Sequence, residues 1–259
     1  MTAAAEPPVG CVVDDGVARI TLNRPRRHNA LVPELLSGLL AATAGLWARD
    51  DLVAVVLAGA GRSFSTGGDV GGFHDVPRDR RRDYAASLVG DLNRAILALM
   101  SLPCPVIGRL HGPVTGGSVG LMLACDLVAM TPACFIAPYY TAVGFSPDGG
   151  WTALMPARIG ERRAREIQLL NRHVQADEAL RLGLADAVVE PDALDATIEG
   201  WLADLRTKSQ ASIRSTRALL RSPTDMAAIA DGLERERQAF LTLIDTEATE
   251  AGMARFLGR

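Results

Sequence analysis

Two glycine-rich segments are the parts of this chain best suited to chemistry. Residues 64–69 read Phe-Ser-Thr-Gly-Gly-Asp and follow the apolar run 52–58, and residues 111–118 read His-Gly-Pro-Val-Thr-Gly-Gly-Ser and follow the run 105–110. Glycine tolerates unusual backbone angles and lets another group approach the chain closely. Two such loops could aim two backbone N–H groups at one oxygen, as an oxyanion hole does, which favours acyl chemistry over phosphate binding. Taken singly, each glycine is also compatible with a tight turn or with close helix packing.

Hydrophobic patterning predicts the elements that carry these loops. Short apolar runs predict strands, helical spacing of leucines predicts helices, and the Asp-Gly pair at 15–16 predicts a hairpin turn. The predicted strands are 11–13, 17–22, 52–58, 106–110, 127–130, 134–137 and 187–190, and the predicted helices are 33–47, 79–100, 119–124 and most of the chain from 162. This order predicts an α/β fold with mostly parallel strands. We expect residues 1–191 to form the core, and the helical residues 192–259 to cover it or to pack against partner subunits.

The composition is that of an ordinary globular protein without a pronounced charge. The chain has 259 residues, of which 48% are hydrophobic and 22% are charged, and its formal net charge is −3. This charge creates no strong field for nucleic acid or for an anionic membrane, so neither is an expected partner. No apolar run approaches the roughly eighteen residues of a membrane span.

The cysteines and the N-terminal residues predict a cytoplasmic location. The four cysteines have neither the spacing of metal ligands nor a Cys-x-x-Cys pair, so no metal site is expected. We expect them to be small buried residues in a reducing compartment. Residues 1–9 lack a basic segment followed by an apolar core, and therefore predict no signal peptide.

Five segments occur in an order that matches one known family. They are 22–31 (Leu-Asn-Arg-Pro-Arg-Arg-His-Asn-Ala-Leu), 55–69, 111–126, 183–186 (Gly-Leu-Ala-Asp) and 252–257 (Gly-Met-Ala-Arg-Phe-Leu). At these segments the chain resembles the crotonase (enoyl-CoA hydratase/isomerase) superfamily. Its first loop is similar to the family's Phe-x-Ala-Gly-x-Asp, and its second loop to Asn-Gly-x-x-x-Gly-Gly-Gly, with His111 at the place of the asparagine. The likeness covers nearly the whole chain.

The resemblance implies a fold, an assembly and a ligand. The fold would be a crotonase-like spiral of ββα units with a helical C-terminal region that mediates oligomerisation, as a homotrimer or a dimer of trimers (a homohexamer). The ligand would be an acyl-CoA thioester, and no separate cofactor is implied because coenzyme A is part of the substrate. The N–H groups of Gly68 and Gly117 would hold the thioester oxygen and stabilise the enolate that forms when a proton α to the thioester leaves.

Further residues are implied to line the acyl-CoA site. Arg24 and Arg26 would lie near the CoA nucleotide, and Phe256 would approach CoA bound to a neighbouring subunit. Asp69 is expected to cap a loop or helix through backbone N–H groups. Together with the two glycines, the implied binding residues are Arg24, Arg26, Ala30, Thr66, Gly68, Asp69, Val70, Gly117, Tyr139, Tyr140 and Phe256.

The same resemblance identifies what this chain lacks for hydration. A hydratase of this family uses two glutamates, and the corresponding motif positions hold Gly120 and Tyr139. Syn addition of water needs one group to activate the water and another to deliver a proton. Because neither carboxylate is present, ordinary enoyl-CoA hydration is disfavoured. Tyr139 and its neighbour Tyr140 are expected to donate a hydroxyl to the substrate or to form an aromatic wall.

One carboxylate remains as a candidate catalytic group. Residues 144–151 read Gly-Phe-Ser-Pro-Asp-Gly-Gly-Trp and resemble the Gly-x-x-Pro-Asp-x-Gly-Gly segment of family isomerases, in which this aspartate, here Asp148, is the base. Isomerisation needs one base that removes a proton at one carbon and returns it at another, and burial in an apolar pocket would raise its pKa. From the local sequence alone, Asp148 could instead simply shape a Pro-Asp-Gly turn. The prediction is an enoyl-CoA isomerase of fatty acid metabolism, with Asp148, Gly68 and Gly117 as catalytic residues.

Other interpretations of the same residues stay open. A hydratase-like enzyme, a dehalogenase-like enzyme in which Asp148 attacks an aryl-CoA, and an acyl-CoA-binding protein without catalysis would all keep this pocket. Gly116, Ser118 and Gly120 also fit the Gly-x-Ser-x-Gly pattern of α/β-hydrolases, although His173 is the only histidine that follows them.

Overall fold

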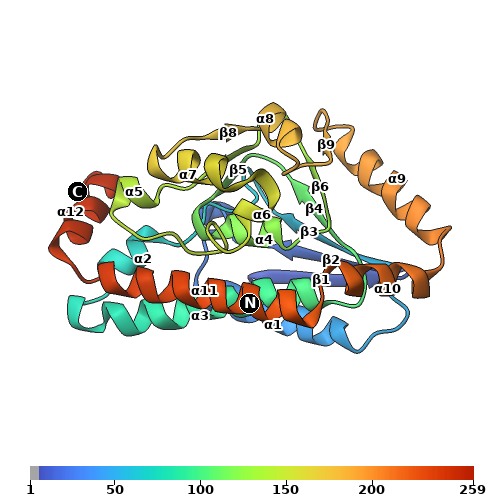
Figure 1. Ribbon diagram of the computed structural model, residues 1–259, viewed down its shortest axis with the longest axis horizontal. Coiled ribbons are helices and arrows are strands. Elements are labelled where there is room, and N and C mark those ends of the chain that lie inside the picture. Colours follow the sequence, from blue (N-terminus) through green and yellow to red (C-terminus); the bar gives the residue numbers. More distant parts are fainter. Residues whose placement is uncertain (1–5) are drawn as a thin grey trace, which may run out of the picture.

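Strands and helices alternate along the chain, and the strands gather into two sheets flanked by helices (Figure 1). The computed structural model describes residues 6–259. Residues 1–5, part of the segment on which the signal-peptide prediction rests, lie outside the described residues. Within the described range, none of the helices combines the length and the hydrophobicity of a membrane span.

The N-terminal hairpin forms the edge of the main sheet. β1 (Val9–Asp14) and β2 (Val17–Leu22) are antiparallel, and Asp15 and Gly16 between them have φ angles of 44° and 72°, positive as a tight hairpin turn requires. The other neighbours in the sheet are parallel, in the order β1-β2-β3-β4-β6-β9. Their bounds are Ala54–Gly59 for β3, Val106–Leu110 for β4, Leu127–Met130 for β6 and Ala187–Val188 for β9. The predicted hairpin and the mostly parallel α/β sheet are confirmed.

A second, smaller sheet explains how the chain spirals. Its order is β5-β7-β8, with β5 at Pro113–Thr115, β7 at Phe135–Ala137 and β8 at Val174–Gln175. Each turn of the spiral places one strand in each sheet and then forms a helix. One such ββα unit is β4, β5 and α4 (Val119–Leu123), and the next is β6, β7 and α5 (Tyr140–Val143). Ser65 forms an isolated parallel bridge with Val114, so the first glycine loop takes the corresponding place after β3.

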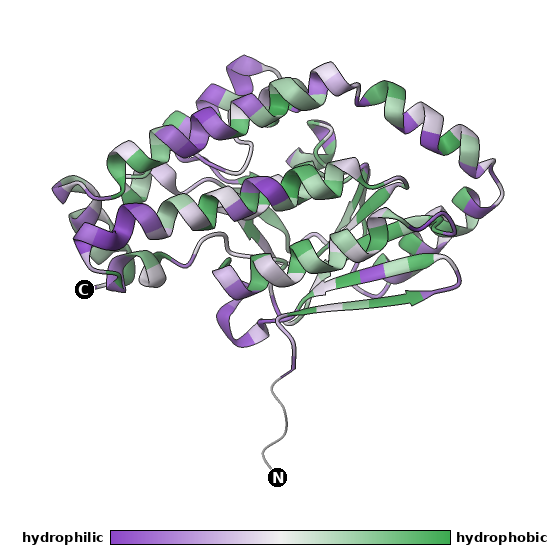
Figure 2. Cartoon of the chain, turned by 90° about the horizontal axis from the view of Figure 1, so that it is seen from below, coloured by the Kyte–Doolittle hydropathy of each residue, from purple (hydrophilic) through white to green (hydrophobic). Residues whose placement is uncertain are grey.

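Helices bury both faces of the main sheet. α1 (Pro33–Trp47) and α3 (Arg78–Ser101) pack together on one face, and α11 (Pro223–Leu243) runs beside α3 (Figure 1). Alternate strand residues point to the opposite face, where α9 (Leu194–Arg206) forms a separate apolar cluster with β2, β3, β4 and β6. In Figure 2 the strands are mainly hydrophobic, whereas the long helices alternate between hydrophilic and hydrophobic residues, as helices at a protein surface do.

The remaining helices are short or lie near the C-terminus. They are α2 (Val70–Asp75), α6 (Met155–Ile159), α7 (Glu161–Leu169), α8 (Ala176–Arg181), α10 (Gln210–Leu220) and α12 (Glu247–Leu257), with 3-10 turns η1 (Pro25–Arg27) and η2 (Gly116–Ser118). The sequence did not predict α2, α5, β5 or β8, because elements of this length show no readable periodicity.

The C-terminal region from residue 192 is helical, as predicted, and much of it covers the core of its own chain. Leu233 and Phe240 of α11 are buried, whereas Leu219 and Leu220 at the end of α10 are 80% and 77% exposed. The trimeric or hexameric assembly stays a prediction.

The cysteines divide into two environments. Cys104, Cys125 and Cys134 are buried as expected, and burial raises the pKa of each thiol. The expectation was wrong for Cys11, which is exposed because β1 is an edge strand with much of its surface open to solvent.

Asn29 joins the segment before α1 to the first glycine loop. Its side chain is fully buried, and its Nδ2 donates to the carbonyls of Ala60, Ser63 and Phe64 at 2.9, 2.9 and 3.0 Å. Its Oδ1 accepts a hydrogen bond of 2.8 Å from the Arg24 N–H. Its φ angle of 53° lies in the left-handed region, which asparagine tolerates better than most residues. One side chain therefore holds two distant segments in register.

We expect Asn29→Ala to destabilise the fold, because several buried carbonyls lose their donor at once. The free energy of unfolding should fall by about 3 kcal/mol, measured by urea denaturation. The control is Asn23→Ala, whose side chain makes its hydrogen bonds at the protein surface. Equal stability of the two variants would contradict this role for Asn29.

Candidate active site

The two glycine-rich loops are joined by hydrogen bonds into one unit. The Ser65 N–H donates to the Pro113 carbonyl at 3.3 Å, and the Thr115 N–H donates to the Ser65 carbonyl at 3.1 Å. The buried Ser118 hydroxyl donates to the same Ser65 carbonyl at 2.9 Å. These contacts fix the first loop against the second.

Glycine is required where the loops touch. Gly67 has a φ angle of +76°, and a Cβ at this position would lie 2.5 Å from the Thr115 carbonyl oxygen and 3.2 Å from the Gly116 Cα. Any side chain would push the loops apart. Close packing of the two loops therefore requires glycine at this position. The same packing also sets the spacing of the backbone groups that face the cavity.

The N–H groups of Gly68 and Gly117 are not used by the surrounding backbone pairing. In the parallel bridge between Leu31 and Gly68, the Leu31 N–H donates to Gly67 and the Asp69 N–H donates to Leu31, so the Gly68 N–H points away from the bridge. Gly117 lies in the first turn of η2, where N–H groups lack a partner within the helix. Both glycines line the same cavity, and two donors there could stabilise a negative oxygen.

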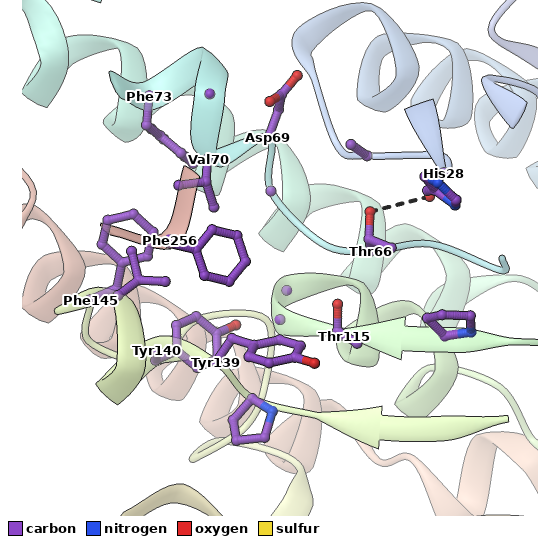
Figure 3. A pocket seen from close by; sticks show the side chains of 18 of the residues that line it. His28, Thr66, Asp69, Val70, Phe73, Thr115, Tyr139, Tyr140, Phe145 and Phe256 are labelled. Carbon is purple, nitrogen blue, oxygen red and sulfur yellow. Dashed lines mark hydrogen bonds between the residues drawn. The ribbon is translucent and has the colours of Figure 1, made fainter. Parts of the chain in front are cut away.

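The cavity has a volume of about 520 Å³ and collects most of the predicted site (Figure 3). The predicted residues that line it are Arg26, Ala30, Thr66, Gly68, Asp69, Val70, Gly117, Tyr139, Tyr140, Asp148 and Phe256. Arg24 is not among the lining residues. Its Nη1 instead donates to the carbonyl of Ala30 at 2.8 Å and so stabilises a residue that lines the cavity.

Asp69 caps a helix, as predicted. Its side chain accepts a hydrogen bond of 3.1 Å from the Gly72 N–H at the start of α2, and Arg27 lies 3.5 Å from its other carboxylate oxygen. α2 in turn places Val70 and Phe73 at the cavity (Figure 3).

Aromatic rings from three distant segments form an apolar end of the cavity. Phe73 of α2 lies 5.9 Å from Phe145 and 5.6 Å from Phe240 of α11, between ring centroids, and Phe145 lies 4.9 Å from Phe240. These residues were not among the predicted site residues, because nothing local in the sequence marks them. Such a surface suits an acyl group.

Phe256 lies in the cavity of its own chain. The approach of Phe256 to CoA bound to a neighbouring subunit stays a prediction. α12 packs against α2 and α5 of the same chain. A Cβ at Gly252 would lie only 1.8 Å from the Val143 carbonyl oxygen, so glycine permits this close contact. The Phe256 ring meets that of Tyr139 edge to face, with centroids 5.9 Å apart, and both form part of the aromatic wall (Figure 3).

Asp148 is the buried carboxylate beside Gly117. It is 7% exposed, and its Oδ1 would lie 2.7 Å from a Cβ at Gly117. The Tyr140 hydroxyl donates to Oδ1 at 2.6 Å and to the Asp148 carbonyl at 3.1 Å. Burial raises the pKa of Asp148 to about 7; the Tyr140 hydrogen bond opposes the rise and the charge of Glu236 adds to it. Burial also holds the pKa of Tyr140 well above its ordinary value, so Tyr140 stays a donor.

The Asp148 loop fills the space beside Gly120. A Cβ at Gly120 would lie 2.3 Å from the Gly149 carbonyl oxygen and 2.4 Å from the Ile96 Cδ1. This backbone therefore leaves no room for a side chain at Gly120, the position at which the resemblance implies a hydratase glutamate. A turn follows Asp148 at Gly149 and Gly150, which both have positive φ, whereas the Asp148 carboxylate accepts its hydrogen bond from Tyr140.

The hydrolase interpretation of Ser118 does not fit. Its hydroxyl is fully buried and donates to the Ser65 and Thr115 carbonyls at 2.9 and 2.7 Å. His173 stacks on Phe135 instead, with ring centroids 5.3 Å apart. In residues 6–259, no group of three His, Cys, Asp or Glu side chains could hold a metal ion.

The chain matches a known family and solved structures of similar fold. Residues 13–259 match the family described as enoyl-CoA hydratase/isomerase. Over 245 residues, 92% of this chain and 86% of the relative, it is 35% identical to the probable enoyl-CoA hydratase EchA12 of Mycobacterium tuberculosis. A solved enoyl-CoA hydratase from Mycobacterium avium subsp. paratuberculosis has a TM-score of 0.86 at 28% identity, covering 97% of this chain and 96% of that one. A monofunctional enoyl-CoA isomerase from M. smegmatis has a TM-score of 0.69 at 30% identity, covering 85% and 98%.

This chain therefore belongs to the enoyl-CoA hydratase/isomerase family, within the crotonase superfamily. The family acts on acyl-CoA thioesters, which defines the class of ligand. The names of the relatives include both hydratase and isomerase, so they do not determine which reaction this chain catalyses.

We expect Gly120→Ala to destabilise the protein by about 3 kcal/mol, because its Cβ would overlap the Gly149 carbonyl. The control is Gly200→Ala in α9, where a Cβ meets nothing within 4 Å, so that helix propensity alone should make the variant slightly more stable. The measurement is urea denaturation of both variants. A stable Gly120→Glu variant with hydratase activity would contradict the steric argument.

We expect Asp148→Asn to gain stability relative to the wild type as pH rises. The folded-state pKa of about 7 lies above the ordinary value of 3.8, so the wild type loses stability between about pH 4 and pH 7 while the variant does not. The gain should reach on the order of 3–4 kcal/mol above pH 7 and vanish near pH 4. Denaturation across this pH range tests it, with the exposed Asp231→Asn as control. A gain that does not depend on pH would refute the raised pKa.

Proposed function

We propose that this protein is an enoyl-CoA isomerase that moves a double bond through an enolate. The observation that carries the proposal is a buried carboxylate, Asp148, that lines the cavity beside Gly117 and has a pKa raised by burial to about 7. A general acid and base works best when its pKa is near the operating pH. Asp69, the other carboxylate at the cavity, is engaged in capping α2.

The proposed reaction needs only one proton carrier. Asp148, as the carboxylate, takes a proton from C2 of a 3-enoyl-CoA, and the electron pair moves onto the thioester oxygen. The N–H groups of Gly68 and Gly117 stabilise that oxygen. The protonated Asp148 then gives the same proton to C4, and the product is a 2-enoyl-CoA. No water or other reactant is consumed.

Tyr140 supports this role for Asp148. Its hydroxyl occupies Oδ1 at 2.6 Å, which leaves Oδ2 as the oxygen that carries the proton. A hydratase would need a second carboxylate, and the space beside Gly120 holds the Gly149 carbonyl instead. The likeness to a protein described as a monofunctional enoyl-CoA isomerase is a further support.

We expect purified protein to convert 3-enoyl-CoA to 2-enoyl-CoA, and Asp148→Asn to lose about 100-fold or more of kcat. The absorbance of the conjugated thioester measures the rate. Because the free enzyme must hold an ionised base, kcat/KM should fall as pH drops below about 7. Full activity in Asp148→Asn would reject this residue as the base.

The control variant is Asp231→Asn, which changes an exposed aspartate on α11 and should keep wild-type rates. Calorimetry with a saturated acyl-CoA separates binding from catalysis. Tight binding without turnover on any thioester would favour an acyl-CoA-binding protein, and hydration of a 2-enoyl-CoA would favour a hydratase.

A further inference from the structure

Glu236 of α11 is a buried carboxylate that the proposed reaction does not use. It is 4% exposed, and no Arg, Lys or His nitrogen of residues 6–259 lies within 4.0 Å of it. A buried charge without a counter-ion is costly unless hydrogen bonds compensate for it. The hydrogen bonds of the Glu236 side chain must therefore compensate for the cost of burying it.

All its hydrogen bonds go to the loop that follows Asp148. Oε2 accepts from the Gly150 N–H at 2.7 Å, and Oε1 accepts from the Thr152 N–H at 2.5 Å, the Thr152 hydroxyl at 2.7 Å and the Ala153 N–H at 2.9 Å. Burial raises the pKa of Glu236, and these donors oppose the rise because they favour the ionised form.

Two consecutive glycines make the shape of this loop dependent on contacts from outside it. Gly149 and Gly150 have φ angles of 64° and 86°, and glycine loses more conformational freedom on folding than other residues. A carboxylate that accepts four hydrogen bonds from residues 150–153 can order this loop. Trp151, whose Nε1 donates to the Gly116 carbonyl at 2.9 Å, ties the same loop to the second glycine segment.

The charge of Glu236 also acts on the catalytic group. The titratable groups that affect Asp148 are Tyr140 of α5 and Glu236 of α11. The residues that α3 and the η2–α4 segment place nearby, Leu92, Ile96, Gly117 and Gly120, carry no charge. The neighbouring Arg237 pairs with Glu234 on the outer side of α11.

We infer that Glu236 is a positioning residue for the proposed isomerase: it fixes the loop that carries Asp148, and its negative charge favours the protonated Asp148 that returns the proton to the substrate. The inference rests on the proposed function for the role of Asp148. It predicts two separable effects, one on the geometry of the loop and one on the titration of the acid.

The test compares Glu236→Gln with the matched control Glu234→Gln, whose side chain pairs with Arg237 at the surface. In Glu236→Gln the amide NH2 faces a loop N–H, so kcat should fall on the order of 10–100-fold with little change in KM. The neighbouring charge is also lost, so the acid limb of the kcat/KM profile should move to lower pH. Glu234→Gln should match the wild type in both.

A second readout does not require turnover. Infrared difference spectra between each protein and its Asp148→Asn counterpart give the titration midpoint of Asp148 without substrate. A lower midpoint in Glu236→Gln supports the inference even if the wild type proves not to be an isomerase. An unchanged midpoint together with unchanged kcat, in an active isomerase, overturns the inference and leaves the proposed function intact.

Two further variants keep the test decisive if Glu236→Gln does not fold. Thr152→Val removes one donor and keeps the charge, and Glu236→Asp keeps the charge but draws the carboxylate back. Both should lower kcat several-fold while the acid limb stays near the wild-type pH. Wild-type kcat in both would overturn the positioning role.

Discussion

The site depends on backbone contact between three chain segments that have no side chains between them. Gly67 meets Thr115, Gly117 meets Gly149, and Gly120 faces the Gly149 carbonyl, each at a distance that a Cβ would not permit. Protein interiors are packed so densely that such contacts cannot absorb an added atom without movement of the backbone. The position of both N–H donors and of the acid therefore follows from a single packing arrangement.

That arrangement buries most of a carboxylate in the wall of the cavity. Asp148 and Glu236 are both buried, and neither is paired with a cation in the described residues. The fold bears an energetic cost for this, since burial disfavours the charged form. The gain is an acid whose pKa lies near neutral pH, where it can both accept and donate a proton.

The sequence predicted those elements that a short-range pattern of residues encodes. The hairpin, α1 and α3 have clear periodicity or turn chemistry, and the glycine loops have few alternatives for their shape. Much of the rest arises from contacts distant in sequence. Phe73, Phe145 and Phe240 meet only in the folded chain, α2 is too short to show a period, and Glu236 looks like one more charge on a polar helix. The place of Arg24 outside the cavity depends on geometry that motif positions do not encode.

One helix carries both the support of the acid and part of the acyl wall. Glu236 and Phe240 stand four residues apart on α11 and so share one face of it. A shift of this helix that widened the space at Phe240 would also displace the carboxylate that holds the Asp148 loop. The width of the apolar end of the cavity and the position of the Asp148 loop are therefore coupled through α11. Phe73 and Phe145 line the same end of the cavity from segments outside α11, so substitutions there would leave Glu236 in place.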